Sequence, residues 1–306
     1  MAERSKQNGL DVYTISSSDG GTRMSFVPTK GGAGSSLIMT QSGKERELLF
    51  QHEYFWDPKN LDLPGGWPFI FPICARIERQ GKEGDYLYDG RIYNLPIHGF
   101  SSRMPWQVRD MKNKDQITLG FTDSPATREV YPFNFDIELT YKISRNSLVC
   151  EQTYTNTGSN AMPYYAGFHP YFLTPSVGQG KERILLNYRP VRHLRYNERL
   201  TDIVGADPLF PLPIAVTDPR VHEQLVVLGD HKVITLSYPD ALKLNMEVLG
   251  KTDKNMFSYV QVYSPSDQPF VCVEPWMSFP NALNSVFGVR WLKSHSSENA
   301  ILKLWV

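Results

Sequence analysis

Two histidines, one glutamate and one arginine stand out in this chain because they lie among aromatic residues, glycines and prolines. They are His98, His169, Glu274 and Arg76. An imidazole and a carboxylate that share a site can give and take protons, and the unperturbed pKa of histidine, about 6.5, suits this work near neutral pH. Two histidines and one carboxylate could alternatively form a facial triad for non-haem iron. The residue types therefore leave acid–base chemistry and metal chemistry open.

The positions of these residues favour a preorganised site. His98 precedes a glycine and His169 precedes a proline, while Glu274 ends the apolar run 270–273 and precedes a proline. Strand ends fixed by such residues hold a side chain still at the rim of a sheet. Each residue alone is more often structural or solvated, and Arg76 alone is more often a surface ion-pair partner. Their joint occurrence favours a site, although periodicity does not by itself bring them together.

The elements that must position these residues are β-strands, because the dominant hydrophobic period is two. Apolar residues alternate with polar ones over 135–144 and over 242–248, as expected for strands with one face toward a core. Asp89-Gly90 predicts a tight hairpin turn between 86–88 and 91–93. No long period of 3.6 residues is visible. The pattern predicts an all-β antiparallel sandwich or barrel with few, short helices.

The chain is expected to form one domain over residues 1–306, in which the first ten residues could be a disordered tail. The proline-rich stretch 207–219 is expected to be a long surface loop rather than a domain boundary. The apolar fraction of 41% is sufficient for a sizeable core. Gly178-Gln-Gly180 is no dinucleotide fingerprint, because it neither follows a predicted strand nor contains the third glycine.

Composition excludes several classes of protein. The 32 basic and 32 acidic residues balance, which argues against a nucleic-acid partner. The three cysteines form no disulfide framework and no CxxC pair, and Cys74 is expected to be a buried structural thiol. The N-terminus has no apolar segment of a secretory signal, and no run of about 18 apolar residues suggests a membrane span. A cytoplasmic location without a membrane partner is the expectation.

Three segments that contain these four residues resemble, in order, the signature segments of the aldose 1-epimerase (galactose mutarotase-like) family. The resemblance extends from about residue 20 to the C-terminus. It rests on these motifs: Gly65-Gly-Trp-Pro-Phe-Ile-Phe-Pro72 followed by Arg76-Ile77, a hairpin and His98-Gly-Phe100; Gly167-Phe-His-Pro-Tyr-Phe172; and Glu274-Pro-Trp276 with Asn281-Ala-Leu283 behind it.

The resemblance implies a β-supersandwich with a concave sugar-binding face. It also implies roles: His169 resembles the general acid, Glu274 the general base, and His98 and Arg76 residues that orient the substrate. The implied reaction is mutarotation of a hexose or hexose phosphate. Opening the hemiacetal needs a base at the anomeric hydroxyl and an acid at the ring oxygen. No metal and no cofactor is needed. A neighbouring arginine or protonated histidine is expected to keep Glu274 ionised.

The chain departs from the family pattern at two places. Related sugar-phosphate mutarotases carry Ala-Arg-Asp after His-Gly-Phe, whereas this chain has Ser101-Ser102-Arg103. If that segment is a strand, Arg103 points to the other face, which puts phosphate recognition in doubt. Galactose mutarotases also carry an additional sugar-binding aspartate, for which Asp218 is the candidate. An anion held by Arg76, Arg79 or Arg103 would indicate a phosphorylated sugar.

Two alternatives to a mutarotase stay open. One is a non-catalytic carbohydrate-binding or sensor protein on the same fold, since fold does not fix function. The other is a metal enzyme that uses His98, His169 and Glu274 as ligands. The expected partner is a small-molecule sugar, with the protein a monomer or homodimer. Four aromatic residues could equally stack on a sugar or pack the core: Trp67, Phe71, Tyr171 and Trp276.

Overall fold

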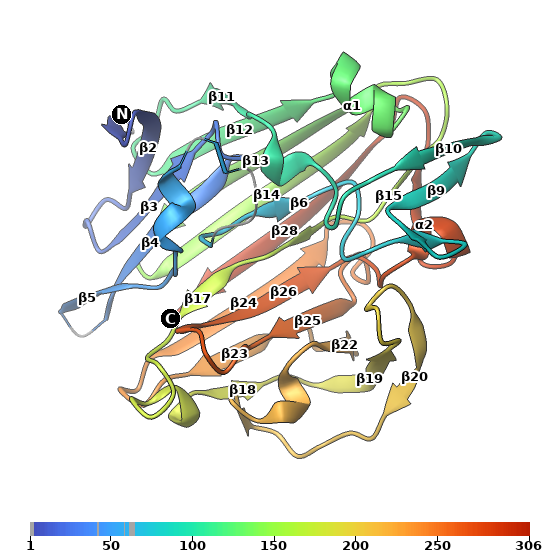
Figure 1. Ribbon diagram of the computed structural model, residues 1–306. Helices are drawn as coiled ribbons and strands as arrows, with labels where there is room; N and C mark the ends of the chain where they lie inside the picture. The colour runs from blue at the N-terminus through green and yellow to red at the C-terminus, as the bar shows by residue number, and fades with distance from the viewer. Residues whose placement is uncertain (1–2, 42, 58, 61–64) are drawn as a thin grey trace.

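Antiparallel β-strands dominate the structure, a computed structural model that describes residues 3–41, 43–57, 59–60 and 65–306 (Figure 1). The α-helices of this part are short: α1 (Pro125–Val130) and α2 (Ala282–Ser285). Single 3₁₀ turns form η1 (Glu53–Trp56), η2 (Ser101–Arg103), η3 (Lys181–Arg183) and η4 (Pro219–Val221). The expected all-β antiparallel fold with few short helices is confirmed.

The largest sheet has nine strands, and its long central strands follow the predicted alternation. Along Phe135–Ser144 the residues from Phe135 to Ile143 alternate strictly between buried and half-buried, because successive side chains in a strand point to opposite faces. The order across the sheet is β11 (Gln107–Asp110), β12 (Gln116–Thr122), β13 (Phe135–Ser144), β14 (Ser147–Asn156), β28 (Ser297–Trp305), β24 (Lys243–Gly250), β23 (Ile234–Ser237), β18 (Leu185–Asn187) and β21 (Ile214–Ala215).

The second large sheet has eight strands and carries most of the segments singled out in the sequence. Its order is β20 (Ile203–Asp207), β19 (Pro190–Tyr196), β22 (Gln224–Leu228), β25 (Tyr259–Tyr263), β26 (Phe270–Trp276), β16 (Gly167–Phe168) and β6 (Phe69–Ile70), and β17 (Tyr171–Leu173) also pairs with β26. In Figure 1, β26, β25, β22, β19 and β20 of this sheet follow one another from the centre of the view toward its lower right.

The core lies between these two sheets. Phe172 of β17 and Val273 of β26 face the same small internal void as Leu236, Leu244 and Leu304 of the nine-stranded sheet. Because side chains alternate along β26, Val273 points into the core, while Glu274 points to the opposite face of the sheet. Burial of the core face therefore fixes the direction of the functional face.

A five-stranded sheet at the N-terminal end differs from the expectation for the first ten residues. It consists of β1 (Glu3–Gln7), β2 (Leu10–Ser16), β3 (Thr22–Val27), β4 (Ala33–Gln41) and β5 (Lys44–Glu47). Residues 3–7, which could have been a disordered tail, pair in register with β2 although all five are exposed. The strand is held through its backbone rather than by buried side chains, so no apolar pattern marks it in the sequence.

Three short strand pairs complete the sheets: β7 (Glu78–Arg79) with β8 (Lys82–Glu83), β9 (Asp85–Tyr88) with β10 (Arg91–Asn94), and β15 (Met162–Tyr164) with β27 (Arg290–Leu292). The predicted hairpin turn at Asp89-Gly90 is confirmed, with both residues at positive φ. A membrane-spanning helix needs about 20 apolar residues, and none of the helices in the described part reaches that length.

Gly167 provides a test of the packing of β16 against β26. It pairs with Trp276, and a Cβ added there would lie 2.6 Å from Trp276 Cδ1 and 2.9 Å from Cys74 Sγ. We expect Gly167→Ala to lower the free energy of unfolding by about 1–3 kcal/mol, as overpacking does in a filled core. Chemical denaturation measures this change. Gly158→Ala, whose added Cβ has ordinary contacts of 3.4 Å or more, is the matched control, and equal effects of the two variants would contradict the close approach.

Candidate active site

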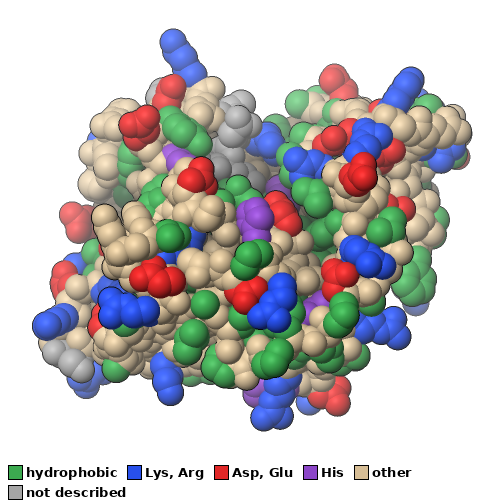
Figure 2. Space-filling model, turned by 60° about the horizontal axis from the view of Figure 1, so that its bottom comes forward, with side chains coloured by type: hydrophobic (Ala, Val, Ile, Leu, Met, Phe, Trp, Pro, Cys, Tyr) green, Lys and Arg blue, Asp and Glu red, His purple; other side chains and the backbone are tan. Residues whose placement is uncertain are grey.

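A small polar cavity opens on the face of the eight-stranded sheet that is turned away from the core. Figure 2 shows histidine and acidic side chains side by side in a hollow near the middle of one face of the molecule. The cavity volume is about 220 Å³, below the roughly 300–1,000 Å³ typical of drug-sized ligands. It suits one small polar molecule. Its walls are Ala75, Arg76, Ile97, His98, His169, Tyr196, Leu200, Glu223, Gln261, Tyr263, Glu274 and Trp276.

His169 and Glu274 meet in this cavity, as the sequence analysis required. His169 follows directly after β16, and its Nε2 lies 3.3 Å from Oε1 of Glu274. Glu274 lies inside β26, which continues to Trp276, rather than at the strand end that we expected. The two segments are adjacent because Gly167 of β16 pairs with Trp276 of β26. A rigid sheet therefore sets the distance between the imidazole and the carboxylate.

Burial shifts the pKa of both members of this pair toward the neutral form. The pKa of His169 falls to about 4 because the ring is buried. The pKa of the Glu274 carboxyl rises well above its usual value, first because of burial and then because of the nearby negative charge of Glu223. Removal from water disfavours the charged form of either group. The expectation that a neighbouring cation keeps the Glu274 pKa low is therefore wrong.

Two buried atoms of the pair lack a hydrogen-bond partner among the described residues. Nδ1 of His169 and Oε2 of Glu274 are buried without a hydrogen-bond partner in the described part of the chain. An unsatisfied buried polar atom costs free energy unless a water, an ion or a ligand supplies its partner. The His169 ring also stacks on Tyr171, with centroids 4.8 Å apart and an interplanar angle of 18°.

His98 lies in a turn at φ 62° rather than at a strand end. The backbone N–H of Ala75 donates to its Nδ1 at 3.1 Å, and its own N–H donates to the carbonyl of Ala75. Because Nδ1 accepts a hydrogen bond, the neutral ring carries its proton on Nε2. The pKa of His98 is well below its usual value because of burial and then the positive charges of His169, Arg103 and Arg76. His98 is thus a neutral donor whose ring centroid lies 5.2 Å from that of His169.

Arg76 lines the cavity as expected, and its Nε lies 3.1 Å from Oε1 of Glu83. Arg103 does not line the cavity. The segment Ser101–Arg103 forms η2 rather than a strand, and Nη1 of Arg103 donates to the carbonyls of Ile97 and Gly99. Arg103 therefore stabilises the turn that contains His98. Arg79 is also absent from the cavity wall.

The prediction for Asp218 is not supported by the geometry. Asp218 is the N-cap of η4, and its carboxylate accepts hydrogen bonds from the backbone and the guanidinium of Arg220. These bonds lower the pKa of Asp218 to about 2. Asp218 is not among the described residues that line the cavity, because its short turn directs the carboxylate back onto its own segment.

The sequence analysis missed a polar chain of three residues in the cavity wall. The Tyr196 hydroxyl donates to Oε1 of Gln261 at 2.8 Å, and Nε2 of Gln261 donates to Oε2 of Glu223 at 2.8 Å. Gln261 of β25 lies directly opposite Glu274 in the register. Gln261 could have been identified from the sequence, because a glutamine between Val260 and Val262 marks the polar face of an otherwise apolar strand. Glu223 sits in a turn at φ 53° and had no such signal.

The four aromatic residues divide between the cavity and the core. Trp276 lines the cavity, and Tyr171 lies beneath the His169 ring. Trp67 and Phe71 are fully buried and pack against other rings. Cys74 is a buried free thiol that donates to the Tyr165 carbonyl, as expected for a structural residue.

A metal ion could be held by a set that differs from the one anticipated. Ligand atoms of His169, Cys272 and Glu274 lie within 4.8 Å of one another, and all three residues are buried. Cys272 replaces His98 in this set because it lies two residues before Glu274 on the same face of β26. Nitrogen, sulfur and oxygen ligands of this kind suit zinc, although the same atoms serve acid–base chemistry without a metal.

Comparison with known proteins identifies a family whose sequences resemble this chain. The model of the aldose 1-epimerase family matches residues 12–286. Protein LacX (chromosomal) of Lactococcus lactis subsp. lactis is 24% identical over 246 residues, covering 76% of this chain and 80% of that protein. The uncharacterized protein YihR of Escherichia coli K12 is 25% identical over 277 residues, covering 85% and 86%.

Solved structures share the fold over the whole chain. The Slr1438 protein from Synechocystis sp. PCC 6803 has a TM-score of 0.78 at 26% identity, covering 100% of this chain and 95% of that one. A galactose mutarotase-like protein from Lactobacillus casei also has a TM-score of 0.78, at 19% identity, with 96% and 99% covered. Galactose 1-epimerase from Lactobacillus acidophilus has a TM-score of 0.71 at 14% identity, with 100% and 98% covered.

Titration of the histidine rings tests the electrostatics of the cavity. We expect the ring nitrogens of His169 to titrate near pH 4, below the usual midpoint, because burial penalises its cation. His98 should stay neutral throughout the neutral range with its proton on Nε2. Two-dimensional ¹H–¹⁵N NMR of the imidazoles measures both values. Midpoints near 6.5 for either ring would contradict the assigned burial.

Proposed function

The chain belongs to the aldose 1-epimerase family, and from this premise we propose that it interconverts the α and β anomers of a hexose by acid–base ring opening and reclosure. One observation carries the proposal. A histidine and a glutamate from different segments lie 3.3 Å apart at the wall of a cavity that fits a single small ligand. A pair of proton-transfer groups, both largely removed from water, is what the opening of a hemiacetal requires.

The proposed reaction begins with the pair holding one proton, placed on Nε2 of His169 with Glu274 ionised. The Glu274 carboxylate takes the proton of the anomeric hydroxyl while His169 gives its proton to the ring oxygen. The bond between the ring oxygen and the anomeric carbon breaks, and the anomeric oxygen becomes the carbonyl of the open-chain aldehyde. Rotation about the adjacent carbon–carbon bond presents the other aldehyde face. Reclosure returns both protons and yields the other anomer.

Burial makes this one-proton state suitable for turnover. Since burial lowers the pKa of His169 and raises that of Glu274, the proton is held weakly by the imidazole and readily accepted by the carboxylate. Two groups that interact this closely titrate as a pair. In the free protein the same shifts favour the proton on Glu274, so the form with protonated His169 and ionised Glu274 is the reactive form, in which both the acid and the base are strong.

Other cavity residues are proposed to bind and orient the sugar. His98 offers an Nε2–H donor and Arg76 a guanidinium, which can donate to ring and hydroxyl oxygens. The chain formed by Tyr196, Gln261 and Glu223 supplies acceptors and donors opposite them. Trp276 provides an apolar surface for a sugar face. These groups take over the role that the sequence analysis gave to Asp218.

The charges of the cavity favour a sugar without a phosphate. Among its described wall residues Arg76 is the one Lys or Arg, and it is already paired with Glu83, while Glu223 and Glu274 are acidic. A phosphate dianion would face these carboxylates with little compensation. We also propose that residues 1–306 act as one catalytic unit. One continuous cluster of buried residues, which reaches from Ile15 to Leu304, supports this.

The first test of this function is the rate at which anomers equilibrate. Polarimetry or NMR on freshly dissolved α-glucose, α-galactose and glucose 6-phosphate should show acceleration by the wild-type protein, greatest for an unphosphorylated sugar. His169→Ala and Glu274→Gln should each lower kcat by about 10²–10⁴-fold, the usual contribution of a general acid or base. Thermal unfolding of each variant controls for folding. Sugar binding without acceleration would instead indicate a binding or sensor protein.

A second pair of variants separates the two acidic residues of the region. Glu223→Gln should lower kcat/KM by about ten-fold or more, because a charge-assisted hydrogen bond of about 1.5–3 kcal/mol to the sugar is lost. Asp218→Asn should leave kcat/KM within about two-fold, since an exposed ion pair contributes little. The same anomer-equilibration assay measures both. A larger loss in Asp218→Asn than in Glu223→Gln would show that the sugar approaches from another side.

A further inference from the structure

Leu200 combines an unfavourable backbone conformation with a position in the cavity wall. It lies in the turn between β19 and β20, at φ 56°, and it lines the cavity. The left-handed region is disfavoured for residues with a Cβ, and a hairpin turn at such a position normally has glycine or asparagine. The turn alone therefore does not explain a leucine. Residues held in such conformations cluster at functional sites.

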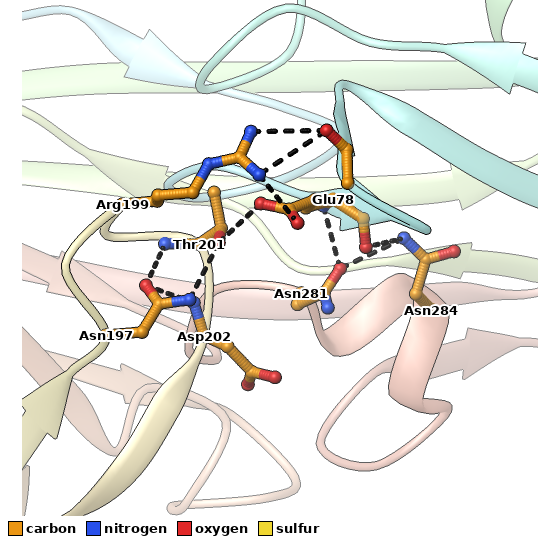
Figure 3. Close-up of polar contacts among 8 residues, drawn as sticks. Glu78, Asn197, Arg199, Thr201, Asp202, Asn281 and Asn284 are labelled. Carbon is orange, nitrogen blue, oxygen red and sulfur yellow. Dashed lines mark hydrogen bonds and ion pairs between the residues drawn. The ribbon is translucent and has the colours of Figure 1, made fainter.

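Both neighbours of Leu200 bind the same carboxylate. Nη1 of Arg199 lies 2.9 Å from Oε1 of Glu78, and the Thr201 hydroxyl donates to Oε2 of Glu78 at 2.9 Å (Figure 3). Within the turn, the Asn197 side chain accepts from the N–H groups of Thr201 and Asp202. The backbone is thus held immediately before and after Leu200, which fixes the place of this residue in the cavity wall.

The same contacts connect Leu200 to Arg76. Glu78 lies on β7, two residues after Arg76. The Asn281 side chain accepts from the N–H of Glu78 at 3.0 Å, and the Asn281 N–H donates to the Arg76 carbonyl at 3.0 Å. Asn284 adds a hydrogen bond to the Glu78 carbonyl. Figure 3 shows these residues around Glu78, with Arg199 and Thr201 from the turn between β19 and β20 and Asn281 and Asn284 from the start of α2. The network holds a polar and an apolar wall residue as one unit.

Leu200 is also one of the few apolar residues in the cavity wall. Most wall side chains can form hydrogen bonds, and the apolar ones besides Leu200 are Ala75, Ile97 and Trp276. A hydroxyl placed against a leucine side chain loses its water partners without replacement, which costs affinity. A C–H or methyl group at the same place gains contact. An apolar pocket rejects an isostere with an added hydroxyl by up to about 100-fold.

We propose that Leu200 determines the sugar specificity of the site and that Glu78 positions it; this proposal rests on the proposed function. Leu200 selects an aldose that carries a hydrogen or a methyl group, in place of a hydroxyl, on the edge that faces this wall. The substrate class is therefore a deoxy sugar. Glu78 makes no contact with the substrate in this account. It acts by holding Leu200 and Arg76 in place.

The experiment compares the fully hydroxylated aldohexose that the protein turns over best with its 2-, 3-, 4- and 6-deoxy analogues. For the wild type, kcat/KM of one deoxy analogue should equal or exceed that of the parent. In Leu200→Asn, which tolerates the left-handed backbone, the ratio of that analogue to the parent should fall about ten-fold or more. Leu209→Asn, a change at an exposed leucine, is the matched control and should leave the ratio unchanged. An unchanged ratio in Leu200→Asn would overturn the proposal.

Variants of Glu78 test its positioning role. Glu78→Ala should raise KM for every sugar and reduce the discrimination of deoxy sugars, with kcat within about three-fold, since His169 and Glu274 lie outside the network. Glu78→Gln can still accept from Thr201 and should recover part of the discrimination. A fall in kcat at unchanged KM, or no recovery in Glu78→Gln, would contradict the assigned role.

Binding measurements separate this proposal from the proposed reaction. If the wild-type protein accelerates no sugar, mutarotation fails, and the same sugars are titrated while the chemical shifts of the protein are followed by NMR. A ratio of dissociation constants that changes in Leu200→Asn and not in Leu209→Asn would then still support Leu200 as the selective residue. Equal ratios, or no binding of any sugar, would overturn it.

Discussion

The contact between His169 and Glu274 is the interaction on which the rest of the site depends. Both groups are almost fully removed from water, and each alone would lose its charge there. Together, at 3.3 Å, they can share one proton and place it on either member. The surrounding structure keeps the two groups at this distance and provides a cavity beside them. A ligand that brings one proton donor and one acceptor to the pair completes the arrangement.

The antiparallel sheet supplies the necessary rigidity. Glu274 and Gln261 lie opposite each other on β26 and β25, so their separation is set by backbone hydrogen bonds rather than by flexible loops. Alternation along β26 directs Val273 into the core and Glu274 into the cavity, which couples burial of the core to the orientation of the carboxylate. The turns that carry His98, Glu223 and Leu200 all contain a residue at positive φ. The sheet therefore fixes the reactive pair, and strained turns shape the rest of the cavity.

The sequence predicted the parts of this site that lie in recognisable motifs or alternating strands. His98, His169, Glu274 and Arg76 all line one cavity, and the all-β fold followed from the period of two. Asp218 was chosen because it lies in the appropriate stretch, but the cap of η4 and Arg220 occupy its carboxylate. Glu223 could not be identified because a turn, not a periodic pattern, brings it to the wall. The raised pKa of Glu274 could not be predicted from the sequence either, because it depends on how completely the fold buries the carboxylate.

A structure of the Glu274→Gln variant with its best sugar bound tests the central claim most directly. The account predicts that the ring oxygen lies within hydrogen-bond distance of Nε2 of His169 and that the anomeric oxygen lies within the same reach of the amide at position 274. The sugar should be a single pyranose held between His98, Arg76 and Glu223. A sugar bound with its anomeric carbon facing solvent, or seated outside this cavity, would contradict the account.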